Sequence, residues 1–254
     1  MSGTPADRGA LSGTPADPGG ASGTPAHPGP LRLGYPRLHL RRIGSTNDRA
    51  RVLAAAGAPH GALVTASEQS AGRGRQGRTW AAPPGRSLLC SVLIRDPARL
   101  LPLAAGVAVA EVVRADAQVK WPNDVLVGGR KIAGILVEGR PQERWAVLGI
   151  GLNVAVRMED LPAELHERAT TMGLGPEALE DVLARLLRAL ERWTAADSGA
   201  VLAAVRERDA LLGRQIRWAA GEGEGAGIDG DGRLVVLTRS GRVALDAGEV
   251  HLVV

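Results

Sequence analysis

Residues 120–138 read KWPNDVLVGGRKIAGILVE, two apolar runs on either side of the pair Gly128-Gly129. Apolar runs joined by two glycines are typical of a β-hairpin, because the turn residues adopt positive φ. Pro122 excludes a helix at the start of this stretch. The second run, 132–137, is continuous and contains β-branched residues, so we expect a strand buried on both faces.

The same hairpin contains both lysines of the chain, Lys120 and Lys131, although Lys and Arg together number 31. Arginine presents a planar fork of donors, whereas lysine presents a compact charge whose pKa responds to its surroundings. Two interpretations stay open at this point. The lysines are ordinary surface cations, or they mark a site that needs an ammonium group beside a negative centre.

The composition limits the class of protein. A chain of 254 residues, 44% of them hydrophobic, holds one good-sized domain or one domain plus a small one. The net charge of +4 suits an anionic small ligand or an acidic partner as well as nucleic acid. We find no apolar stretch of about 20 residues, which a membrane span needs, and no signal-peptide pattern.

The cysteine and histidine content limits the chemistry further. The single cysteine, Cys90, excludes an intrachain disulfide and a cysteine-rich zinc site, and it favours a reducing compartment such as the cytoplasm. The five histidines are scattered without metal-ligand spacing. We therefore expect no metal site built by the protein itself.

Residues 1–30 repeat with a period of ten as MSGTPADRGA, LSGTPADPGG and ASGTPAHPGP. Gly, Pro, Ser, Thr and Ala dominate, so the segment has little to bury and is expected to be a disordered tail. We expect it to be dispensable for the activity of the chain.

A polar cluster opens the first predicted helix. Residues 45–57 run from Ser45 through an Ala-rich body to Gly57, which predicts a helix capped by Ser45. Ser45 and Asn47 are either caps alone or polar groups that face a ligand at the helix N-terminus; both interpretations stay open.

Residues 68–80 read EQSAGRGRQGRTW and form a Gly-Arg loop. In an extended loop Arg73 and Arg75 project to one side and Gly72 and Gly74 leave the other side bare. Three cations within six residues repel one another, so we expect a loop that is mobile when empty and ordered by an anion. A solvated basic loop and an RNA-binding Gly-Arg segment are the competing interpretations, but only one such unit occurs and no aromatic residues interleave it.

The remaining periodicity predicts an α+β fold. Strands are expected at 62–67, 87–95, 118–121 and 145–152, and helices at 100–114, 176–193 and 200–212. After Gly213 the chain consists of short β-runs between glycine-rich turns, at 215–219, 234–238, 243–245 and 249–254. This pattern predicts a small C-terminal β-barrel.

Four motifs occur together in one order: GSTND at 44–48, EQSAGRGRQGRTW at 68–80, the hairpin at 120–138 and GIGLN at 149–153. In wording and order they resemble the biotin protein ligases, over roughly residues 40–155. The resemblance implies a mixed-sheet catalytic domain at 31–211 and an SH3-like barrel at 212–254. Many members carry an N-terminal DNA-binding domain; here that place holds the repeat tail, so a single-function ligase without DNA binding is expected.

The resemblance also implies roles for particular residues. Lys120, Arg73 and Arg75 would be catalytic, with Lys120 between the biotin carboxylate and the α-phosphate. Nucleotide contacts would come from Trp80, Lys131 and Asn153. The biotin-binding set would comprise Ser45, Thr46, Asn47, Gln69, Arg73, Gly74, Arg75 and Lys120.

The implied reaction joins biotin to ATP, with Mg²⁺, and forms biotinyl-5′-AMP and pyrophosphate. A lysine of a biotin carboxyl carrier domain, part of a carboxylase, then attacks this mixed anhydride. The sequence shows no nucleophile–base pair, which fits a reaction without a covalent enzyme intermediate. The alternatives are a lipoate–protein ligase of related fold and a Gly-Arg nucleic-acid-binding protein.

Overall fold

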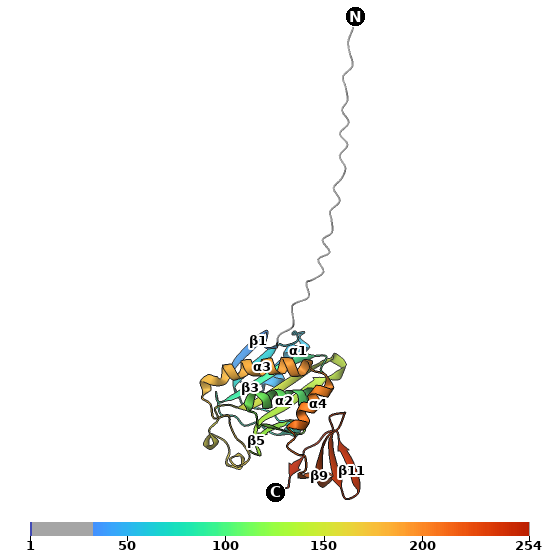
Figure 1. Ribbon diagram of the computed structural model, residues 1–254. Helices are drawn as coiled ribbons and strands as arrows, with labels where there is room; N and C mark the ends of the chain where they lie inside the picture. The colour runs from blue at the N-terminus through green and yellow to red at the C-terminus, as the bar shows by residue number, and fades with distance from the viewer. Residues whose placement is uncertain (2–32, 254) are drawn as a thin grey trace. The chain divides into compact units, whose positions relative to one another are not determined.

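The computed structural model describes Met1 and residues 33–253 (Figure 1), so the predicted tail 1–30 lies outside the described part apart from Met1. A seven-stranded sheet has the order β1-β2-β3-β7-β6-β5-β4, in which β1 and β2 are parallel and the other neighbours antiparallel. Its strands are β1 (Arg37–Ile43), β2 (Leu63–Gln69), β3 (Ser87–Arg95), β4 (Gln118–Lys120), β5 (Asp124–Val127), β6 (Arg130–Arg140) and β7 (Trp145–Asn153). The predicted mixed α+β architecture is confirmed, and β1 is a strand that we did not predict.

The helices divide between the two faces of this sheet. They are α1 (Thr46–Ala55), α2 (Leu101–Val113), α3 (Leu179–Ala195) and α4 (Ser198–Glu207). Residues of β7 alternate in the direction of their side chains, as strand geometry requires. Leu148 and Ile150 join the core under α2 and α3, whereas Trp145 and Val147 pack in the cluster with α1.

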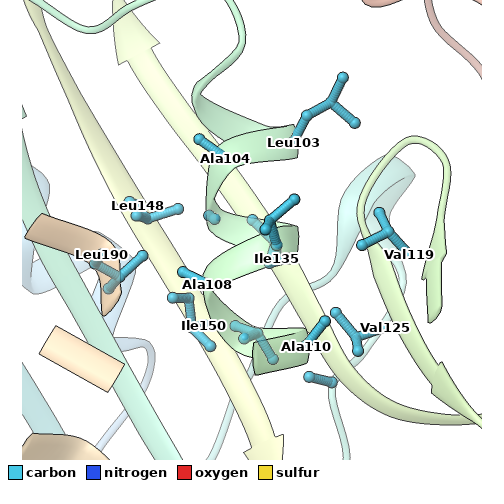
Figure 2. Close-up of a cluster of buried hydrophobic side chains, with 14 of the residues drawn as sticks. Leu103, Ala104, Ala108, Ala110, Val119, Val125, Ile135, Leu148, Ile150 and Leu190 are labelled. Carbon is cyan, nitrogen blue, oxygen red and sulfur yellow. The ribbon is translucent and has the colours of Figure 1, made fainter. Parts of the chain in front are cut away.

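Helix α2 occupies the centre of the larger core. It presents the small residues Ala104 and Ala108 to the sheet, and Figure 2 shows Leu148 and Ile150 of β7 beside them. Helix α3 packs against α2 through its apolar stripe and also contacts β3. The predicted 3.6-residue periodicity of this helix is confirmed, since Val182, Leu183, Leu186 and Leu190 are all buried.

The hairpin predicted at 120–138 is confirmed as β5 and β6, with positive φ at Gly128 and Gly129. The expectation that its second strand is buried on both faces is wrong. Ile132 and Ile135 are buried, but Gly134 and Leu136 are half-buried because they line a cavity. The continuous apolar run therefore has one face in the core and one face along the cavity.

A second sheet of five antiparallel strands follows, in the order β11-β10-β9-β8-β12. Its strands are β8 (Gln215–Trp218), β9 (Gly221–Ile228), β10 (Leu234–Thr238), β11 (Gly241–Leu245) and β12 (His251–Leu252). The sequence predicted only glycine-rich turns between the β-runs at 215–219 and 234–238, and for 221–227 this is wrong. Gly223 and Gly225 belong to a strand where a Cβ atom would collide with the carbonyl oxygens of Leu237 and Leu211.

No helix among the described residues is long and apolar enough to cross a membrane. The boundary between the two predicted domains at residue 212 stays a prediction.

Because Leu148 is completely buried between the sheet and α2, Leu148→Ala should lower the free energy of unfolding by about 2–5 kcal/mol. The loss combines transfer free energy with the cavity left beside Ala104. Urea unfolding followed by circular dichroism measures it. The control is Leu174→Ala, the same change at a leucine that is 41% exposed, for which less than about 0.5 kcal/mol is expected. Equal losses in the two variants would contradict this assignment of the core.

Candidate active site

A cavity of about 710 Å³ opens on the α1 side of the large sheet. Its walls come from the start of α1, the Gly-Arg loop, the β5–β6 hairpin, the end of β7 and the C-terminal segment around β12. All the residues that the sequence singled out line it: Ser45, Thr46, Asn47, Gln69, Arg73, Gly74, Arg75, Trp80, Lys120, Lys131 and Asn153. The tertiary structure thus brings four separate motifs to one place.

Glycines in β6 and β7 make the floor of this cavity. A Cβ atom on Gly149 would collide with the side-chain amide of Asn47, and one on Gly151 would collide with the indole of Trp80. A Cβ on Gly134 would lie 3.1 Å from the same indole. The GIGLN motif therefore serves close packing, as glycines inside strands often do.

A buried polar network forms one end of the cavity. Thr46 donates from its backbone N–H (2.7 Å) and from its hydroxyl (3.0 Å) to Gln69 Oε1. Ser91, which is fully buried in β3, approaches Thr46 Oγ1 at 2.8 Å and Asn47 Oδ1 at 2.6 Å. The sequence offered no signal for Ser91, because it stands in an apolar strand. Ser45 occupies the N-cap position, but its side chain makes no capping hydrogen bond, so the predicted cap is wrong.

Asn47 is held by a second neighbour that the sequence analysis did not single out. Its Nδ2 group donates to Leu136 O at 3.3 Å and to Glu138 Oε2 at 2.8 Å. Arg73 Nη2 contacts the same Glu138 oxygen at 2.9 Å and Asp48 Oδ1 at 2.7 Å. Arg73 Nε is buried and has no hydrogen-bond partner among the described residues.

The expectation that only a bound anion offsets the repulsion within the Gly-Arg loop is wrong. Glu138 and Asp48 pair with Arg73, and Glu249, which lies between β11 and β12, pairs with Arg78. In the described part of the chain Arg75 is the arginine of this loop that has no ion-pair partner, and its contact is Asn123 Oδ1 at 3.4 Å. Burial is the main reason why the pKa of Arg75 is lowered. Mobility of the empty loop stays a prediction.

The two lysines lie on either side of Asp124. Lys131 Nζ is 2.6 Å from Asp124 Oδ1 and 5.6 Å from the centre of the Trp80 ring, a cation–π geometry. Lys120 is the last residue of the short strand β4 and lines the cavity. Burial lowers its pKa below the ordinary 10.5, which the Asp124 carboxylate opposes and the Lys131 charge reinforces. The ammonium groups of Lys120 and Lys131 therefore both line the cavity.

Asn153 is nearly fully buried at the end of β7, where its Nδ2 donates to Thr170 O at 3.0 Å. The segment that it fixes also pairs with the backbone of Lys131, through Lys131 N–H to Arg168 O at 2.7 Å. Asn153 thus holds in place the segment around Thr170 that pairs with the backbone of Lys131. Its predicted contact with a nucleotide stays a prediction.

The cavity is cationic overall. Six basic side chains line it, against three carboxylates: Lys120, Lys131, Arg73, Arg75, Arg78 and Arg168, facing Asp124, Glu167 and Glu249. No group of three or more His, Cys, Asp or Glu side chains among the described residues has the arrangement of a metal site. The fold and this cavity define an α+β protein whose large sheet carries a cavity lined mainly by basic side chains.

Comparisons with known proteins give the family. Residues 40–154 match the model of the biotin/lipoate A/B protein ligase family. A biotin–[acetyl-CoA-carboxylase] ligase of Mycobacterium tuberculosis is 36% identical over 236 residues, covering 82% of this chain and 86% of that protein. The chain belongs to the biotin/lipoate A/B protein ligase family.

Two further relatives show the extent of the likeness. The bifunctional ligase/repressor BirA of Bacillus spizizenii is 40% identical over 142 residues, which cover 51% of this chain but 44% of that protein. The structure of the Aquifex aeolicus biotin protein ligase in complex with biotin and ATP superposes with a TM-score of 0.71 at 28% identity, covering 85% of this chain and 97% of that one.

Because partial burial lowers the pKa of Lys120, its amine should acylate with half-maximal reactivity at a pH below 10.5. The variant Lys131→Arg leaves Lys120 as the sole lysine, so labelling by an acylating reagent can be followed by peptide mass spectrometry as a function of pH. Lys120→Met in the same background provides the blank. A midpoint at or above 10.5 would contradict the buried position of this ammonium.

Proposed function

We propose that this protein is an ATP-dependent biotin–protein ligase. It joins the carboxylate of biotin to the α-phosphate of ATP, supplied as its Mg²⁺ complex, and releases pyrophosphate. A lysine of a biotin carboxyl carrier domain then attacks the carbonyl carbon of biotinyl-5′-AMP, and AMP leaves. The observation that carries the proposal is a single cavity with a buried polar network at one end and a cation cluster beside it.

The polar end suits the ureido ring of biotin. Gln69 Oε1 is occupied by two hydrogen bonds from Thr46, which leaves the Gln69 amide N–H groups to donate to a ligand carbonyl. Both amide hydrogens of Asn47 are used by β6, so Asn47 offers an oxygen lone pair to a ligand N–H. Ser45 and Thr46 complete this proposed biotin site.

The cation cluster suits the first chemical step, in which a carboxylate approaches a polyanion. Two unit charges about 4 Å apart repel by roughly 4 kcal/mol at an effective dielectric constant of 20. We assign Lys120 and Arg75 to that repulsion and to the charge that develops at phosphorus. Lys131 lies across Asp124 from Lys120, beside Trp80 and Asn153, where we place the nucleotide.

The Gly-Arg loop suits protection of the intermediate. A mixed anhydride hydrolyses readily, and a loop that covers it excludes water. Gly74 leaves room for the ligand, and Arg75 has an unshared charge to pair with the adenylate phosphate. The buried Arg73 Nε–H is a further free donor.

The five-stranded sheet supports the proposal of a small SH3-like domain at 212–254, after a catalytic domain at 31–211. Its short antiparallel strands suit that fold, although β11 and β12 are edge strands of an open sheet. Glu249 and His251 reach the catalytic cavity from it. We further propose a cytoplasmic location, on the basis of the unpaired, buried Cys90, and no role in DNA binding.

Pyrophosphate release tests the proposed function. The full chain, ATP, Mg²⁺ and biotin should release pyrophosphate, and a carrier domain should become biotinylated on lysine. The control replaces biotin with lipoate, which should give little release. Turnover with lipoate and none with biotin would make the protein a lipoate–protein ligase. Nucleic-acid binding without turnover of either substrate would exclude the ligase function.

Lys120→Gln should slow biotin-dependent pyrophosphate release by about 10²-fold or more, as expected when a preorganised charge donor is lost. Biotin affinity, measured by calorimetry, should change far less. Lys131→Gln is the matched comparison, because it removes the other ammonium beside Asp124. A Lys120→Gln rate within a few-fold of wild type, alongside a severe loss for Lys131→Gln, would transfer the catalytic role to Lys131.

Arg75→Gly should release biotinyl-5′-AMP faster, because the intermediate loses a charge-assisted contact and its cover against water. Free adenylate acylates exposed lysines, so a lysine-rich bystander protein should be labelled more strongly than by wild type. Gln76→Gly is the control: it loosens the same loop at a positive-φ position without removing a charge. Equal bystander labelling by Arg75→Gly and wild type would contradict the role of Arg75.

A further inference from the structure

Glu138 sits where the biotin end of the cavity and the Gly-Arg loop meet. One carboxylate oxygen, Oε2, lies 2.8 Å from Asn47 Nδ2 and 2.9 Å from Arg73 Nη2. In the described part of the chain Asn47 and Arg73 share no direct hydrogen bond. The carboxylate is therefore their common partner.

The network around Asn47 decides which end of its amide a ligand meets. Asn47 is 4% exposed, so a reversed amide would bury mismatched groups. Glu138 and the carbonyl of Leu136 accept from the nitrogen, and Ser91 contacts the oxygen. A carboxylate at 138 is acceptor-only and admits only the nitrogen on its side. Glu138 thereby keeps the Asn47 oxygen available on the ligand side.

The same carboxylate anchors the Gly-Arg loop. Glu138 is 26% exposed, whereas Asp48, the second partner of Arg73, is 54% exposed. Solvent screens the Asp48 contact more strongly, so Glu138 is the more effective counter-ion. With Nη2 held by carboxylates, the guanidinium keeps its buried Nε–H free. Loss of Glu138 would let Arg73 turn toward Asp48 and solvent.

We infer that Glu138 is a positioning residue that orients Asn47 for biotin and holds Arg73 of the Gly-Arg loop over the adenylate. The inference rests on the proposed function and adds to it a link between recognition of biotin and retention of the intermediate. A ligand bound at Asn47 and a closed loop at Arg73 would both stabilise the same position of the Glu138 side chain. Such shared partners couple two sites energetically.

The variants Glu138→Gln and Glu138→Ala separate the two tasks. Glutamine retains an oxygen that can accept from Asn47 but removes the charge that faces Arg73, and alanine removes both. Biotin affinity is measured by calorimetry without ATP, and adenylate dissociation by release of preformed biotinyl-5′-AMP. Glu138→Ala should weaken biotin binding about threefold to tenfold and speed adenylate release about tenfold. Glu138→Gln should bind biotin within about twofold of wild type and still release adenylate faster.

Asp48→Asn is the matched control, because Asp48 contacts Arg73 but not the Asn47 side chain in the described structure. It should leave biotin affinity unchanged. Wild-type biotin affinity in Glu138→Ala, or unchanged adenylate release in Glu138→Gln, would overturn the inference. If Glu138→Ala does not fold, as judged by circular dichroism, the Glu138→Gln release rate decides alone. A wild-type chain that binds no biotin would overturn the proposed function, and the inference with it.

Discussion

The site depends on the absence of side chains at three positions of the central strands. Gly149 admits the amide of Asn47, and Gly134 and Gly151 admit the indole of Trp80. Any larger residue would push these groups off the sheet and fill the cavity floor. The opposite face of the same strands carries Leu148 and Ile150, which anchor the sheet to α2. One strand therefore supports the core on one side and leaves space for a ligand on the other.

The basic side chains around the cavity fall into two groups, those paired with carboxylates of the protein and those that are not. Arg73 and Arg78 are neutralised by carboxylates of the protein, which come from β6, α1 and the segment between β11 and β12. Arg75 and Lys120 are partly buried without a hydrogen-bonded carboxylate in the described structure, and burial lowers the pKa of each. A bound anion stabilises such a cation strongly, because its charge offsets the desolvation cost that burial has already imposed on the cation. The cationic residues thus divide into those that shape the loop and those that face the ligand.

The C-terminal sheet is also part of this arrangement. Glu249 reaches Arg78, and the turn before β10 accepts a hydrogen bond from Trp121 Nε1 through Gly232 O at 3.1 Å. Trp121 directly follows Lys120, so the sheet braces the lysine strand as well as the loop.

The sequence by itself determined the features that arise from neighbouring residues. The hairpin at 120–138 followed from two apolar runs around Gly128-Gly129, and α3 followed from its 3.6-residue stripe. The four motifs also contain the predicted site residues that line the cavity, but they gave no signal for Arg168 or Glu249 in its wall. The tertiary structure alone decided which face of β6 lines the cavity, why glycine-rich β9 is a strand, and which partners the loop arginines take. Glu138 lies 65 positions from Arg73 and Glu249 lies 171 from Arg78, and no local periodicity carries information across such separations. Those contacts exist because the packed sheets fix the distance between segments that the chain order leaves apart.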